Sequence, residues 1–473
     1  MKTPIYDFLV KHGNKETISF HMPGHKASDI YEKYGYGDFL NNIIRYDITE
    51  IYGADNLYKA EGIIKEGEER YARLYGAKAS FFLVNGTTTG ILAAILSSVK
   101  KGGKLIMARN SHKSVFNALR LGEIQPVYIY PEIVEAFNVC GEIDHREIKN
   151  AIISNPDAEA VILPSPNYYG ICSNIEKIAE IVHEYNKILI VDEAHGAHLK
   201  FSDRLPKSAV DSGADIVINS IHKTIASFTQ SAVMHVNSER VDIDNIKDKL
   251  QIIQSTSPSY LLMASLDISA SIMEEDGKNL VNQLVDNIDM FCDKVRSAEG
   301  IKIMKQEDIK SSFDKTKINI DMTELGLTGS DVEKILREKY NIYMEMVSAN
   351  LVMGLSGVGN SKEDFLRLAD ALIEIKEIYR KNEMINFPPI MFEKNLQVYH
   401  PAELVTEHSK WVDLDESIGC VSGSAIIPYP PGVPLICPGE IISKKILNYL
   451  IALKKTDVRI LGVREDNKVQ VQD

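Results

Sequence analysis

The sequence lacks the features that mark secreted, disulfide-bonded or membrane-spanning proteins. Its five cysteines are scattered and form no C-x-x-C pair, so neither a disulfide framework nor a cysteine metal site is indicated. The N-terminal residues contain no apolar core of a signal peptide, and no uninterrupted apolar stretch approaches the roughly 18 residues of a membrane span. We therefore expect a cytoplasmic protein with reduced thiols and no membrane segment.

Basic residues are also fewer than acidic residues. Lysine and arginine number 53 against 66 aspartates and glutamates, which gives a formal net charge of -13. Binding to nucleic acid or to an anionic membrane requires a basic face, so the charge argues against both kinds of partner. The composition, 44% hydrophobic and 25% charged, is that of an ordinary globular protein, and a chain of 473 residues is long enough for two or three compact units.

The order of apolar segments predicts an α/β fold with a mostly parallel sheet. Continuous apolar runs, typical of strands buried on both faces, occur at Ser80–Val84, Lys104–Ala108, Pro126–Tyr130, Ala160–Leu163, Ile188–Val191 and Ile216–Asn219. Segments with helical periodicity lie between them, at Thr88–Val99, Ser114–Leu121, Asn174–Glu184 and Val210–Gly213.

The pattern changes after about residue 290. Strands are expected at Lys317–Asp321, Ile342–Glu345 and Leu351–Leu355, followed by a helix at Lys362–Arg380 and a proline-rich tail. We predict an N-terminal arm at residues 1–60, a large α/β domain at 61–290 and a smaller α+β C-terminal region at 291–473.

Two motifs at predicted strand ends carry groups suited to a carbonyl cofactor. Lys223, in Ser-Ile-His-Lys-Thr, could form a Schiff base if its amine is partly desolvated, although a surface lysine would give the same local sequence. Asp192, which ends Ile-Leu-Ile-Val-Asp, could pair with a protonated ring nitrogen, or it could only cap a helix. The spacing of His195 and His198 resembles metal-ligand spacing weakly, and we expect no metal site.

Two further motifs fit the same site. Asn85–Gly90 reads Asn-Gly-Thr-Thr-Thr-Gly between a predicted strand and a helix, where free N–H groups and hydroxyls favour phosphate binding; a simply capped helix is the alternative. It is not a P-loop, because the required Gly-Lys-Ser/Thr is missing. His112, in Arg-Asn-Ser-His-Lys-Ser after a strand, could lie flat on a cofactor ring or could only begin a helix.

These motifs, in this order, resemble those of the fold-type I enzymes that use pyridoxal 5'-phosphate (PLP). More narrowly, the chain resembles the Orn/Lys/Arg decarboxylase family in its short form. The resemblance rests on H-M-P-G-H-K (residues 21–26), F-F-L-V-N-G-T-T-T (81–89), R-N-S-H-K-S (109–114), D-E-A-H-G-A-H (192–198), S-I-H-K-T (220–224), S-T-S-P-S-Y (255–260) and P-Y-P-P-G-V-P-L-I-C-P-G-E (428–440). It implies a fold-type I large domain with a smaller α+β C-terminal domain.

The resemblance implies a role for each matching residue. Thr88, Thr89 and Ser220 would hold the cofactor phosphate, and His112 would stack on the pyridine ring. Asp192 would pair with the ring nitrogen and stabilise the charge that develops there.

Further residues would complete the cofactor site. His195 would lie near the phenolic oxygen, Lys223 would be the Schiff-base lysine, and His222 or Lys223 would return a proton to the substrate. Ser255 or Thr256 would reach the phosphate of a neighbouring subunit, because the family builds its sites at a dimer interface. A homodimer or higher homo-oligomer with shared active sites is therefore expected.

The implied activity is decarboxylation of a basic amino acid, with L-arginine to agmatine as the first choice and lysine or ornithine as alternatives. Glu345 would bind the distal cation of the substrate, and Tyr429 would line the same pocket; Glu345 could also be a solvated strand-end residue. Aminotransferase or aldolase activity, or a non-catalytic PLP-binding regulator, are the rival interpretations. The retention of Lys223, Asp192 and His112 together argues against a non-catalytic regulator.

Two features depart from the family pattern. Thr-Ile-Ala-Ser-Phe follows Lys223 where many short relatives have a proline, so the resemblance does not define the loop geometry there. The chain also begins close to H-M-P-G-H-K, without a counterpart of the wing domain of long members. We therefore do not expect the assemblies associated with that domain.

Overall fold

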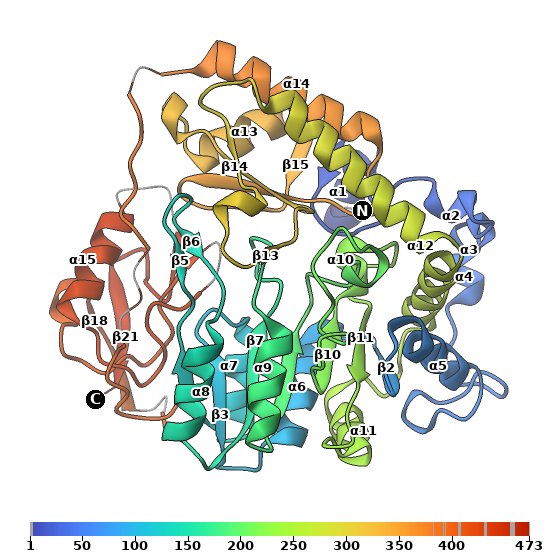
Figure 1. The fold of residues 1–473 in the computed structure, drawn as a ribbon, viewed down its shortest axis with the longest axis horizontal. Helices are drawn as coiled ribbons and strands as arrows, with labels where there is room; N and C mark the ends of the chain where they lie inside the picture. Colours follow the sequence, from blue (N-terminus) through green and yellow to red (C-terminus); the bar gives the residue numbers. More distant parts are fainter. Residues whose placement is uncertain are drawn as a thin grey trace.

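A seven-stranded sheet forms the centre of the large domain. The computed structural model describes residues 3–381, 383–390, 392, 394–404, 408–429, 433–454 and 459–472. The strand order is β2 (Ala79–Leu83), β11 (Ala232–Val236), β10 (Ile216–Asn219), β9 (Ile188–Asp192), β7 (Ala158–Pro164), β3 (Lys104–Ala108) and β4 (Gln125–Ile129) (Figure 1). The strand β11 runs antiparallel to both of its neighbours, and the other six share one direction.

The structure confirms all six strands predicted for this domain and corrects two other points. The strand β11, beside the predicted strands, was not predicted. The helix predicted at Val210–Gly213 is wrong: the segment forms turns, with Gly213 N donating to Val210 O at 3.2 Å. Gly213 has φ 88°, a left-handed conformation that does not continue a right-handed helix.

Alternate residues of the central strands point to opposite faces of the sheet, and each face is covered by helices. On one face, residues such as Leu105 and Met107 pack against α6 (Gly86–Ser98), α7 (Lys113–Leu121) and α11 (Ile243–Ile253). On the other face, Ile106 and Ala108 pack against α8 (His145–Ser154) and α9 (Ile175–Glu184). This double covering explains why the strands read as continuous apolar runs.

A second sheet of four antiparallel strands lies beyond the large domain. Its order is β12 (Lys302–Ile303), β14 (Lys317–Asp321), β17 (Leu351–Leu355) and β16 (Met346–Val347). It packs with α13 (Gly329–Lys339) and α14 (Lys362–Tyr379) around a core of its own. The 36-residue helix α12 (Tyr260–Val295) runs from the large domain to the side of α14, so the predicted boundary at residue 290 lies inside one helix (Figure 1).

The N-terminal arm joins these two parts. Its elements are α1 (Pro4–Gly13), β1 (Ile18–Phe20), α2 (Ile30–Lys33), α3 (Gly37–Asn41), α4 (Ile43–Tyr46) and, at the start of the large domain, α5 (Ile63–Tyr75). The strand β1 pairs in parallel with β15 (Ile342–Met344), which follows it by more than three hundred residues. No helix among the described residues has both the length and the apolar character needed to cross a membrane.

The last unit of the chain lies beside the β3–β4 edge of the large domain, drawn in red in Figure 1. It contains β18 (Ser409–Asp413), β19 (Ile427–Tyr429), α15 (Lys444–Leu453), β20 (Arg459–Leu461) and β21 (Lys468–Gln472). A fully buried ion pair attaches it: Arg109, directly after β3, donates to both carboxylate oxygens of Glu440 at 2.7 Å. Arg109 also donates to the carbonyls of Pro434 and Leu435 at 3.2 and 3.1 Å.

We predict that Arg109→Met lowers the free energy of unfolding by about 3–5 kcal/mol, because it leaves Glu440 buried without a counter-charge. The double variant Arg109→Met/Glu440→Met should recover most of this loss, since it removes both charges. Urea denaturation checks the difference. Arg204→Met, which breaks an exposed ion pair with Asp286, is the control and should cost less than about 1 kcal/mol. Equal losses in the single and double variants would contradict the prediction.

Candidate active site

The sequence motifs meet at the carboxyl edge of the large sheet, where open α/β sheets bind their ligands. Asp192 is the last residue of β9, and the loop that follows it carries His195. Ser220 follows β10 and precedes the short helix α10 (Ile221–Thr224), which carries Lys223. The loop after β3 leads to His112.

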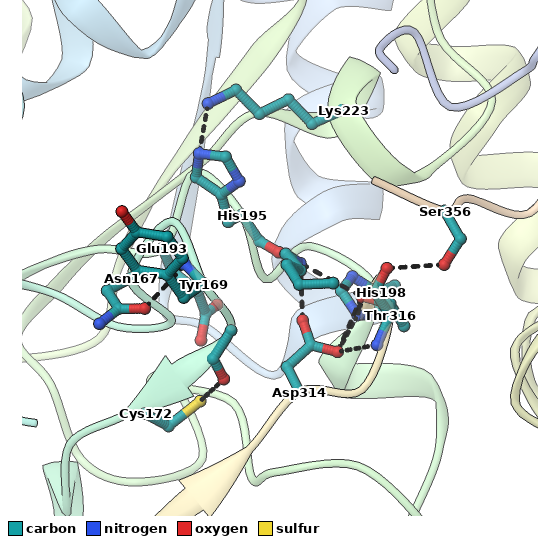
Figure 2. Close-up of polar contacts among 12 residues, drawn as sticks. Asn167, Tyr169, Cys172, Glu193, His195, His198, Lys223, Asp314, Thr316 and Ser356 are labelled. Carbon is teal, nitrogen blue, oxygen red and sulfur yellow. Dashed lines mark hydrogen bonds and ion pairs between the residues drawn. The ribbon is translucent and has the colours of Figure 1, made fainter. Parts of the chain in front are cut away.

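Lys223 and His195 are in direct contact. The Nζ atom of Lys223 lies 3.0 Å from Nε2 of His195, as Figure 2 shows. Burial lowers the pKa of Lys223, the charges of Asp192 and Glu345 act in the opposite direction, and Lys317 lowers the pKa further. Burial also takes the pKa of His195 well below its usual value. A neutral imidazole therefore faces an amine that loses its proton more readily than a solvated lysine, and nucleophilic attack on a carbonyl requires the unprotonated amine.

Asp192 lies in the same buried region. Its side chain is 6% exposed, and Oδ1 accepts a hydrogen bond from Ala194 N at 3.1 Å. Burial raises the pKa of Asp192, while the charge of Lys223 acts to lower it. The carboxylate thus gains from a positive partner, which a protonated ring nitrogen would supply.

The helix α6 begins with the features of a phosphate site. Asn85 provides no side-chain cap, so the first N–H groups of the helix are left for another acceptor. Gly86 has φ 73°, a left-handed conformation that suits glycine, and it turns the chain into the helix. The Thr87 hydroxyl lies 3.1 Å from the Ser220 hydroxyl.

The three threonines of this motif have different environments. Thr88 is exposed at the helix N-terminus, whereas Thr89 is buried and its hydroxyl donates to Asn85 O at 3.2 Å. Thr87 was not selected from the sequence, yet it is the threonine that meets Ser220. The three side chains point in different directions because they occupy successive positions of the first helical turn. Three identical residues in the sequence do not show which position each one occupies.

The other two candidate histidines, His112 and His222, are also held in the neutral form. His112 is the N-cap of α7: its Nδ1 atom lies 2.8 Å from the Ser114 hydroxyl, and burial, followed by the charge of Lys223, lowers its pKa to about 4. Nδ1 of His222 lies 2.7 Å from Ser231 O, which can only accept, so Nδ1 carries the hydrogen. Burial lowers the pKa of His222 to about 4 as well.

Glu345 lies between β15 and β16 and contacts the N-terminal arm. Its Oε2 atom accepts from Met22 N at 2.8 Å, and its charge acts on both Lys223 and Lys26. Lys26, from H-M-P-G-H-K, donates to the carbonyls of His21 and Leu355, and burial lowers its pKa to about 7. The sequence motif identified this arm segment without indicating that it borders the site.

The remaining predicted residues are not joined to this group by a described contact. Ser255 and Thr256 are exposed on the loop between α11 and α12, and the Ser255 hydroxyl donates to Ser257 O at 3.3 Å. Tyr429 ends β19, and its side chain lies outside the described residues. The two histidines of H-G-A-H have separate partners, because His195 contacts Lys223 and His198 contacts Asp314.

The residues present fit PLP. The uncapped start of α6 and two neighbouring hydroxyls suit its phosphate, the buried Asp192 carboxylate suits its ring nitrogen, and the Lys223 amine suits its aldehyde. Nδ1 of His195, Oδ1 of Asn110 and Oγ of Ser111 are buried and have no hydrogen-bond partner among the described residues. Unpaired polar atoms of this kind are costly unless a ligand satisfies them.

Comparison with known proteins identifies the family of the chain. Residues 3–320 match the model of the Orn/Lys/Arg decarboxylase major domain, and residues 382–469 match the model of the C-terminal domain of the same family. The chain is 32% identical to an arginine decarboxylase of Bacillus subtilis over 456 residues, which cover 95% of this chain and 93% of that protein. It is 24% identical to the inducible lysine decarboxylase of Escherichia coli K12, covering 98% of this chain and 79% of that protein.

Solved structures agree on the fold. The lysine decarboxylase LdcF of Francisella novicida superposes with a TM-score of 0.80 at 22% identity, covering 99% of this chain and 81% of that one. An L-threonine transaldolase of Pseudomonas fluorescens superposes with a TM-score of 0.61 at 15% identity, covering 79% of this chain and 88% of that one. The large domain has the fold of type I PLP enzymes, and the chain belongs to the Orn/Lys/Arg decarboxylase family of PLP-dependent enzymes.

Proposed function

We propose that the protein decarboxylates L-arginine to agmatine and CO2, a reaction that supplies polyamine synthesis, in the cytoplasm. The observation that carries the proposal is the position of Glu345, a carboxylate that accepts from Met22 N at 2.8 Å in the arm loop beside the site and whose charge acts to raise the pKa of Lys223. A guanidinium that leaves water needs such a counter-charge. Four relatives that are 30–32% identical over most of the chain and named arginine decarboxylases favour arginine over lysine or ornithine.

The residues of the site would divide the work of decarboxylation. When bound, PLP supplies an electron sink for the bond between the α-carbon and the carboxylate. Thr87, Thr88 and Ser220 would bind the phosphate, with Thr89 supporting the helix through Asn85. Asp192 would hold the proton on the ring nitrogen, and His112 would cover one face of the ring.

The proton that returns to the α-carbon comes, in this proposal, from Lys223. The alternative donor, His222, has its Nδ1 hydrogen directed to Ser231 O, and a pKa of about 4 leaves its Nε2 unprotonated near neutral pH. His195 would keep the Lys223 amine oriented through their 3.0 Å contact. Arg109 is paired with Glu440, so it does not serve as the carboxylate clamp of an aminotransferase.

Exposed apolar side chains support a homodimer or higher homo-oligomer with shared sites. The helix α1 buries none of its residues, and Ile5 and Phe8 are 77% and 64% exposed. Large apolar side chains of the arm, including Ile44 and Tyr52, are exposed as well. In such an assembly Ser255 or Thr256 would approach the phosphate of the partner, and Tyr429 would contribute to a substrate pocket.

The identity of the substrate is tested directly by product analysis. We expect the purified, PLP-loaded protein to release CO2 and agmatine from arginine faster than it forms cadaverine from lysine or putrescine from ornithine. Mass spectrometry of the amines gives the result. Faster formation of cadaverine or putrescine would replace arginine by the corresponding substrate.

We predict that Lys223→Ala abolishes turnover and covalent attachment of PLP, because Lys223 is the lysine of the described site whose amine contacts the His195 imidazole. Borohydride reduction and peptide mapping of the wild type should place the pyridoxyl label on Lys223. Lys247→Ala, an exposed lysine on α11, is the control and should behave as wild type. A label on Lys26 or Lys317, the other lysines of the region, would refute the assignment.

We predict that Asp192→Asn retains bound PLP but lowers kcat by orders of magnitude. An amide cannot stabilise a protonated ring nitrogen, while the phosphate contacts stay intact. Cofactor content is measured by absorbance after gel filtration, and kcat by CO2 release. A PLP-loaded variant with nearly normal kcat would exclude this role for Asp192.

We predict that Glu345→Gln raises KM for arginine by roughly 10- to 1000-fold through the loss of charge-assisted pairing, with little change in PLP content. Glu363→Gln, an exposed glutamate of α14, serves as the matched control. Turnover of the neutral analogue citrulline isolates the charge effect. If the variant still prefers arginine over citrulline as strongly as wild type, another carboxylate binds the cation.

A further inference from the structure

A buried polar cluster lies directly beneath the loop that carries His195. It consists of His198 from that loop and Asp314, Thr316 and Lys317 from the chain entering β14, and none of these residues is more than 1% exposed. Figure 2 shows His198, Asp314 and Thr316 converging below the contact between His195 and Lys223. Charges buried this deeply are stable only when they are paired and hydrogen-bonded.

Lys317 satisfies all three of its N–H donors inside the protein. Its Nζ atom donates to Asp314 Oδ2 at 2.6 Å, to the Thr316 hydroxyl at 3.2 Å and to the main-chain carbonyl of His195 at 2.5 Å. The third bond does not serve the ion pair. It fixes the backbone of the residue whose imidazole contacts Lys223.

Asp314, the carboxylate that pairs with Lys317, is itself held by several hydrogen bonds. Its Oδ1 atom accepts from Thr316 N at 3.1 Å and from the Thr316 hydroxyl at 2.8 Å, and lies 3.2 Å from Nε2 of His198. The Asp314 N–H donates to Gly170 O at 2.7 Å, and the Ser356 hydroxyl donates to Thr316 O at 2.7 Å. The cluster is thus hydrogen-bonded both to the large domain, through Gly170, and to Ser356, which directly follows β17.

The charge of Lys317 also reaches the site. The groups that act on the Lys223 amine are Asp192, His195, His112, His222, Glu345 and Lys317. The three histidines are neutral near pH 7, and the two carboxylates favour the protonated amine. Lys317 is the cation among them, and it opposes the two carboxylates.

We propose that Lys317, held by Asp314, is a positioning residue for Lys223. It fixes the His195 backbone so that the imidazole keeps the amine of Lys223 in place, and its charge favours the unprotonated amine that captures the PLP aldehyde. This inference rests on the proposed role of Lys223 as the lysine that binds PLP. A purely structural role would instead be to pin β14 and the second sheet to the large domain.

Three variants separate positioning from structure. Lys317→Met removes the donor and the charge, and leaves Asp314 buried without its partner. Lys317→Met/Asp314→Asn also neutralises that carboxylate, while an amide oxygen can still accept from Thr316. Lys315→Met is the matched control, because Lys315 lies two residues away in a partly exposed ion pair with Asp289.

The measurements are the melting temperature of the apoprotein and the rate at which it captures PLP at Lys223, followed by absorbance between pH 6 and 9. We expect Lys317→Met to melt earlier and the double variant to recover most of the melting temperature. Both should capture PLP roughly three- to tenfold more slowly at pH 7, with the pH profile displaced to higher pH, because the opposing charge is lost in both. Lys315→Met should match wild type in both measurements.

A double variant that regains both the melting temperature and the wild-type pH profile would overturn the inference and leave a structural role. A Lys317→Met protein that does not fold leaves the decision to the double variant. The failure of the proposed function has a different signature: wild-type protein would then carry its borohydride-stable label on a lysine other than Lys223, or carry none.

Discussion

Three lysine amines and three carboxylates lie in or beside the candidate site at the carboxyl edge of the large sheet, where burial acts on their charges. The amines belong to Lys26, Lys223 and Lys317, and the carboxylates to Asp192, Asp314 and Glu345. Lys317 and Asp314 form the close pair, at 2.6 Å. Burial lowers the pKa of both Lys26 and Lys223. The other groups of the site surround the Lys223 amine, which must be shielded from water and must still react.

The arm loop H-M-P-G-H-K supports the chain around Lys223, a structural role that the motif alone did not reveal. Gly24 N donates to His222 O at 2.6 Å, and a Cβ atom on Gly24 would lie 2.5 Å from Ile225 O. The loop therefore packs directly on the segment that follows Lys223. Backbone hydrogen bonds, including Val358 N to Thr224 O at 3.0 Å, hold this segment from the other side.

The sequence predicted the strands and site residues that depend on local pattern. It missed residues whose contacts lie far away along the chain. Continuous apolar runs indicated six strands of the large sheet, and strand-end motifs indicated Lys223, Asp192 and His112, because a parallel sheet brings such ends together. Thr87 was missed because three identical neighbours differ only in helix register. Lys317 and Lys26 were missed because their partners, His195 and Leu355, lie 122 and 329 residues away.

The ion pair between Arg109 and Glu440 has a consequence for the order in which the protein can be completed. The two residues are 331 positions apart, so the ribosome has made most of the chain before Arg109 can meet its partner. Until then the guanidinium after β3, three residues before His112, has no counter-charge and must stay hydrated. The loop that carries His112 can therefore reach its final form only after the segment around Glu440 has been made, which couples the geometry of the candidate site to the folding of the C-terminal unit.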